Sequence, residues 1–171
     1  TGIMRRDFAR AIAHHDAALK ALGRRSALDP SDAEARRNYA DQIVMKATAQ
    51  NMMKDGAGAL ASTESALTLL RELAAADTKN VEARKDLAFA YGEQAMALTH
   101  LGRLDEARRA YKRANEIHEQ RLGKDPSSKE DRRDLTRLEF GLGDDLTVHL
   151  GQHLLENLGV DPGREGDRTQ K

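Results

Sequence analysis

Residues 77–124 read DTKNVEARKDLAFAYGEQAMALTHLGRLDEARRAYKRANEIHEQRLGK. The start of this stretch recurs 48 residues earlier as DPSDAEARRNYA and 48 residues later as DPSSKEDRRDLT. Self-similarity at one fixed period is the signature of a repeat array, so each 48-residue stretch is treated as one unit. The coinciding residues include Asp29, Asp77 and Asp125; Glu34, Glu82 and Glu130; Arg36, Arg84 and Arg132; Ala11, Ala59 and Ala107; and Ala18, Ala66 and Ala114.

Within one unit, the apolar residues predict two helices joined by a turn. One apolar face runs from Ala83 to Tyr91 at helical spacing, and a second runs from Leu104 to Ile117. Gly102 lies between them and suits the end of a helix. Neither period-2 alternation nor turn-bounded runs of β-branched residues occur, so a β or mixed fold is not expected.

These residues resemble the tetratricopeptide repeat (TPR), a helix–turn–helix unit of about 34 residues whose two helices are called A and B. Asp125-Pro126 matches the acidic-Pro turn that ends a repeat. The longer period here adds two segments of about seven residues, each about two helical turns, which keeps the same face inward. The matches are Leu87, Ala88 and Tyr91 in helix A, and Ala107, Tyr111 and Ala114 in helix B.

The resemblance covers roughly residues 8–150 and implies an all-α, right-handed solenoid of antiparallel helix pairs. About six long helices and a short C-terminal helix are expected in one domain, residues 1–160, while the polar residues 161–171 are expected to be a disordered tail. The array looks like those attached to bacterial signalling proteins, including serine/threonine kinases, which implies part of a larger regulatory protein. The units are expected near 1–28 (partial), 29–76, 77–124 and 125–160.

The first helix is expected from Phe8 to Leu22, and it resembles a helix B without its helix A. The chain is therefore expected to be a piece of something longer. Because repeat arrays need capped ends, this helix is expected to expose an apolar face that includes Ile12 and Leu19. Further along, capping boxes are expected at Ser31/Glu34 and Ser127/Glu130, with Asn80 capping the middle unit.

Composition excludes several classes of function. Lys plus Arg and Asp plus Glu number 28 each, which argues against a general nucleic-acid binder and a polybasic membrane patch. There is no Cys, so thiolate chemistry, thiolate metal sites and disulfides are excluded. Neither a membrane-spanning run nor a signal peptide is visible. We predict a cytoplasmic protein without a cofactor.

A basic pair recurs in each unit at the start of helix A, and the resemblance implies a binding groove there. TPR helices A line a concave groove that takes a peptide or a partner helix. The alternative is an inter-repeat lattice of ion pairs that uses Glu34, Glu82 and Glu130. The predicted partner-binding residues are Arg37, Lys85 and Arg133; Asn38 and Asp86 beside them; and Asp41, Phe89 and Arg137 one turn on.

Catalytic and metal-site signals are weak. The sequence contains neither a nucleophile elbow nor a complete phosphate-binding loop. The first candidate metal site is His149 and His153, with Asp145 one turn before; they lie on one helical face but lack a third His or Cys. The second candidate is His14-His15-Asp16, where packing of His15 is favoured over metal binding. We therefore predict a non-catalytic protein-interaction module. The alternative function is dimerisation through the N-terminal helix, or a spacer role. A third hypothesis is a helical-bundle enzyme or metal protein.

Overall fold

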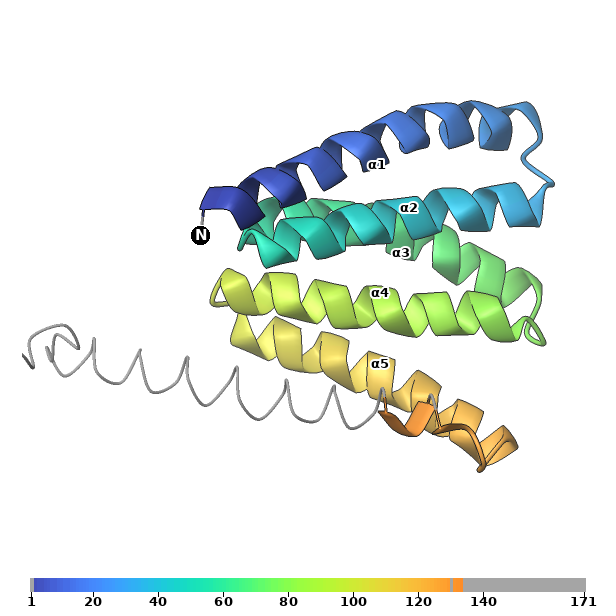
Figure 1. The fold of residues 1–171 in the computed structure, drawn as a ribbon. Helices are drawn as coiled ribbons and strands as arrows, with labels where there is room; N and C mark the ends of the chain where they lie inside the picture. Colours follow the sequence, from blue (N-terminus) through green and yellow to red (C-terminus); the bar gives the residue numbers. More distant parts are fainter. Residues whose placement is uncertain (1, 130, 134–171) are drawn as a thin grey trace, which may run out of the picture.

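A computed structural model describes residues 2–129 and 131–133, and over this part the chain is all-helical, as predicted (Figure 1). The third unit beyond Arg133 lies outside the described residues, together with Arg137, Asp145, His149, His153 and the tail 161–171. The long helices are α1 (Gly2–Leu28), α2 (Ala33–Met52), α3 (Gly56–Ala76), α4 (Val81–His100) and α5 (Leu104–Lys124).

The first helix is longer than predicted at both ends, because it spans Gly2–Leu28 rather than Phe8–Leu22. It ends where Asp29 precedes Pro30, and a residue before proline avoids the helical conformation. Leu19 packs against the core, so the expected bare apolar face is wrong for this residue. The cause is the close packing of α1 on α2.

Helices of type A begin one residue later than the predicted capping boxes require. Asp32 accepts a hydrogen bond from the Ala35 backbone N–H at 2.8 Å, so Asp32 rather than Ser31 caps α2. Ser31 instead donates its hydroxyl to Asp29 at 2.6 Å. Because a short turn around Asp29 already engages Ser31, the next residue takes over the capping role.

The caps of the next two units stand at the same place as Asp32. Asn80 caps α4 as predicted, through a 2.9 Å bond from the Ala83 N–H. In the third unit, the Ser128 hydroxyl accepts from the Asp131 N–H at 3.2 Å, so Ser128 replaces the expected Ser127. At the other end of α4, Gly102 adopts φ +70°, the left-handed conformation expected of a glycine that ends a helix.

Consecutive helices pack against each other, and α2 additionally contacts α4. In the view of Figure 1, α3 lies behind α2. No described helix is both long and apolar enough to cross a membrane. Small residues let the helices approach closely while leucines and tyrosines fill the space between them. The core contains Ala59, Ala66, Leu67, Leu70, Ala88, Tyr91, Ala107, Tyr111 and Ala114, all buried.

The start of α3 approaches the end of α4 so closely that only glycine fits at position 56. A Cβ added there would lie 2.9 Å from the Ala97 carbonyl oxygen and 3.0 Å from the His100 Cβ. We expect Gly56→Ala to lower the free energy of unfolding by about 1–3 kcal/mol, because backbone must move to make room. Urea unfolding measures the effect.

The matched control is Gly123→Ala near the end of α5, where an added Cβ has no neighbour within 4 Å. That variant is expected to be neutral or to gain up to about 1 kcal/mol from helix propensity. Equal changes in the two variants would contradict a close helix approach at Gly56.

Candidate functional site

The predicted binding residues of the first two full units lie on α2 and α4, two helices in contact. We call this surface the α2–α4 face and define it by Arg37, Asn38, Asp41, Lys85, Asp86 and Phe89. Of the two remaining predicted residues, Arg133 is exposed at the start of the helix after α5, and Arg137 lies outside the described residues.

Arg37 joins the two helices of this face. Its Nε donates to Asp86 Oδ2 at 2.5 Å, and its Nη2 lies 3.5 Å from Glu82 Oε2. The hydrogen bond that Arg37 donates to Asp86 raises the pKa of the Arg37 guanidinium above its usual value. The adjacent Arg36 forms an ion pair with Glu72 of α3. Both arginines are therefore bonded within the fold, as the lattice alternative predicts for Arg37 and Glu82.

Asp41 lies one turn after Arg37 and is the half-buried carboxylate of the face. Burial and, after it, the charge of Asp86 raise the pKa of Asp41, while Arg37 and His15 act in the opposite direction. In the part of the chain that the structure describes, neither a hydrogen bond nor an ion pair engages its carboxylate. Asp86 is thus a second carboxylate close enough to Asp41 to act on its charge.

The rest of the face is part exposed and part apolar. Asn38 is exposed, and the Lys85 side chain is half-buried and makes contacts of its own. Phe89 is half-buried and packs against the core. Because Phe89 stands 48 residues after Asp41, it occupies in the second unit the place that Asp41 occupies in the first. The face therefore carries a carboxylate in one unit and an apolar ring at the same position of the next unit.

Two of the candidate metal-binding residues near the N-terminus, His15 and Asp16, contact side chains of α2. His15 Nδ1 lies 3.0 Å from Gln42 Oε1, and Asp16 forms an ion pair with Lys46 at 2.7 Å. These contacts tie α1 to α2. Among the described residues, no group of three His, Cys, Asp or Glu side chains is placed to hold a metal ion.

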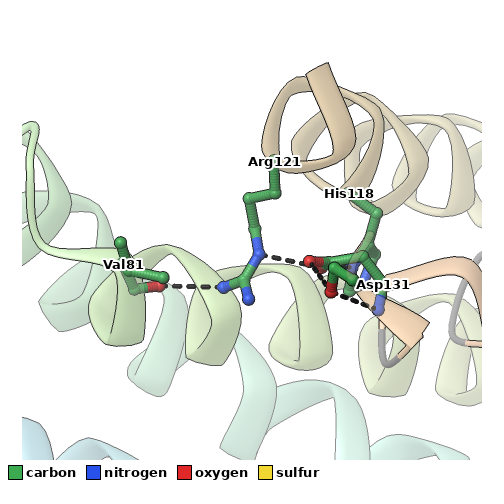
Figure 2. Close-up of polar contacts among 5 residues, drawn as sticks. Val81, His118, Arg121 and Asp131 are labelled. Carbon is green, nitrogen blue, oxygen red and sulfur yellow. Dashed lines mark hydrogen bonds and ion pairs between the residues drawn. The ribbon is translucent and has the colours of Figure 1, made fainter. Parts of the chain in front are cut away.

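A second polar cluster, which the sequence reasoning missed, lies between α5 and the helix after it (Figure 2). Asp131 Oδ1 lies 3.0 Å from His118 Nδ1 and accepts from Arg121 Nε at 2.8 Å. Ser128 donates to Asp131 Oδ2 at 2.8 Å. Arg121 Nη1 donates to the Val81 carbonyl oxygen at 2.9 Å. The cluster thus ties together α4, α5 and the start of the third unit.

Asp131 and His118 are each only 3% exposed. Burial raises the pKa of Asp131, but hydrogen bonds from His118, Ser128 and Arg121 together outweigh burial and hold the pKa below its usual value. One unit earlier, Leu70 and Ala83 stand at the places of His118 and Asp131. This departure from an apolar repeat position was the sequence signal for the cluster.

Comparison of the chain with models of protein families, with curated proteins and with solved structures gave no match.

Proposed function

We propose that the chain is a non-catalytic protein-interaction module built as a right-handed, TPR-like solenoid of antiparallel helix pairs. The order of contacts between α3 and α4 supports antiparallel pairing. Gly56 at the start of α3 lies beside Ala97 near the end of α4, whereas Arg71 further along α3 bonds to Tyr91 earlier in α4. The Arg37–Asp86 bond supports stacking of successive units, because it joins neighbouring positions of two units.

The proposed binding surface is the α2–α4 face, against which a peptide or helix of a partner protein would lie. Asp41 carries the proposal. A half-buried carboxylate without a bonded counter-charge costs free energy, and a lysine or arginine from a partner would relieve that cost. Phe89 supplies an apolar contact in the next unit. The ligand that fits is an amphipathic segment that presents a basic residue at the Asp41 end.

We propose a cytoplasmic location, which the absence of Cys fits. We also propose that the module belongs to a larger bacterial signalling or regulatory protein, as the TPR resemblance implies. Self-association or a spacer role through α1 stays a prediction. Its support is that, among the described helices, α1 contacts only α2, and that Leu28 at its end is 86% exposed.

The test is Asp41→Asn, which removes the charge and keeps the shape. We expect the variant to hold the partner about tenfold more weakly, because a charge-assisted bond is lost.

We also expect Asp41→Asn to gain up to about 1 kcal/mol of stability at neutral pH, because an unpaired carboxylate is removed. Since the pKa of Asp41 is raised in the folded protein, this gain should disappear as the pH falls below the carboxylate range, near pH 4. Affinity capture from lysate followed by titration of the captured protein measures the first effect, and urea unfolding measures the second.

Asp105→Asn on α5 is the matched control, because it removes an exposed carboxylate whose ion pair within the described part of the chain is a 3.4 Å contact with Arg108. The control should leave binding and stability unchanged. Equal partner affinity in wild type and Asp41→Asn would contradict the proposed face. Capture of nothing but the chain itself would favour self-association.

A further inference from the structure

A groove of about 470 Å³ opens between α3 and α5, with α4 as its floor. Tyr91, Gln94 and Leu98 of α4 line the floor, and the buried Leu60 of α3 and Ala110 of α5 line the lower walls. At 100° per residue, Tyr91 and Leu98 lie on the side of α4 opposite to Asp86. The groove is therefore separate from the α2–α4 face.

Arginines from both walls converge on the Tyr91 ring. Arg71 of α3 donates from Nε to the Tyr91 hydroxyl at 3.0 Å, and its guanidinium lies 5.5 Å from the ring centroid. The Arg113 guanidinium of α5 lies 5.9 Å from the same centroid. Arg109 lines the groove one turn before Arg113. Cation–π contacts hold such groups in place without neutralising their charge.

The positive charge of this groove is not balanced. Arg103 at the rim is matched by Glu106, with two bonds of 2.7 Å. In contrast, none of Arg71, Arg109 and Arg113 forms an ion pair in the part of the chain that the structure describes. Glu64 is the other carboxylate in the lining. Arg36 and Arg37, the basic pair at the start of α2, differ from these arginines, since both are paired with carboxylates.

The repeat itself provides an internal comparison. Shifting the groove back by one unit replaces Arg71 by Gly23 and Tyr91 by Ile43. The same shift replaces Arg109 by Ala61 and Arg113 by Ser65. In contrast, Ala107 and Ala114 correspond to alanines in the preceding unit as well. The fold therefore does not require these cations. They belong to one groove of the array rather than to the repeat pattern.

The geometry points to a binding site in this groove for a small molecule that carries a phosphate group. A single arginine saturates a carboxylate through two parallel bonds, but a phosphate offers three oxygens and about two charges. Three guanidinium groups on two walls match that ligand better. The volume falls within the range of small-molecule sites, so it leaves room for the organic part of the ligand beside the phosphate.

The experiment is calorimetric titration of the full chain with inorganic pyrophosphate at constant ionic strength. The test variant is Arg109→Ala/Arg113→Ser, which copies Ala61 and Ser65 of the preceding unit and is therefore expected to fold. We expect saturable binding by wild type and at least about tenfold weaker binding by this variant. The control, Arg108→Ala/Lys112→Ser, removes the same charge from the neighbouring exposed side of α5 and should change binding less than about twofold.

Absence of saturable pyrophosphate binding by wild type would overturn the inference, as would equal weakening in the test and control variants. A phosphoserine peptide that competes at this groove and binds more tightly than pyrophosphate would overturn the small-molecule assignment in favour of a phosphorylated partner. Asp41→Asn should leave pyrophosphate binding unchanged, so failure of this inference is distinguishable from failure of the proposed function.

Discussion

Replacement of Asp131 by alanine is expected to lower the free energy of unfolding by about 3–5 kcal/mol. The change leaves the buried His118 and the Arg121 side chain, which is 11% exposed, without the carboxylate that both contact. It also removes the acceptor of the Ser128 hydroxyl at the start of the third unit. Urea unfolding at neutral pH measures the loss.

Asp105→Ala on the exposed side of α5 is the control and should change stability by less than about 0.5 kcal/mol. The pH dependence gives a second check. Because the pKa of Asp131 is lowered in the folded protein, its contribution is complete above the unfolded value near pH 4 and is lost as the pH falls further. The difference between wild type and Asp131→Ala should therefore shrink in acid. A loss below about 1 kcal/mol at neutral pH would contradict a buried, bonded carboxylate.

The helices were predictable because each local signal agrees with the 48-residue period. Gly102 takes the left-handed conformation that ends α4, and Ala107 and Ala114 are buried as the apolar pattern predicts. Helix starts were predicted less well. A sequence shows that Ser31 is able to cap a helix, but not that Asp29 engages it first.

The candidate site was predictable only as a surface. The period places Arg37 and Lys85 near the start of successive A helices, with Asp41 one turn after Arg37, but it does not reveal which charges are bonded across helices. The bond from Arg37 to Asp86 depends on how α2 crosses α4. Likewise, the arginines around Tyr91 come from α3 and α5, which are too far apart in sequence for spacing alone to bring together.

The buried polar cluster stands where the preceding unit is apolar, and this permits a direct exchange. Leu70, Leu73 and Ala83 occupy the places of His118, Arg121 and Asp131. All three are buried in the α3–α4 contact. The chain thus contains two solutions to the same packing problem, one apolar and one ionic.

We expect the triple variant His118→Leu/Arg121→Leu/Asp131→Ala to be as stable as wild type or up to about 4 kcal/mol more stable. Removing all three polar side chains avoids their desolvation, whereas Asp131→Ala alone leaves His118 and Arg121 without the acceptor that both contact. The carbonyl oxygen of Val81, at the exposed start of α4, then bonds to water instead of Arg121. Urea unfolding of the triple variant beside the single variant measures this non-additivity.

A triple variant as unstable as Asp131→Ala would show that the ionic cluster itself stabilises the fold. If the triple variant is as stable as wild type or more stable, stability does not account for the cluster. Its directional bonds would then serve to fix geometry. Apolar contacts tolerate sliding, whereas Asp131 must meet His118, Arg121 and Ser128 at once. The cluster would then fix the register in which the third unit joins α5, and with it the position of Arg133 relative to the α2–α4 face.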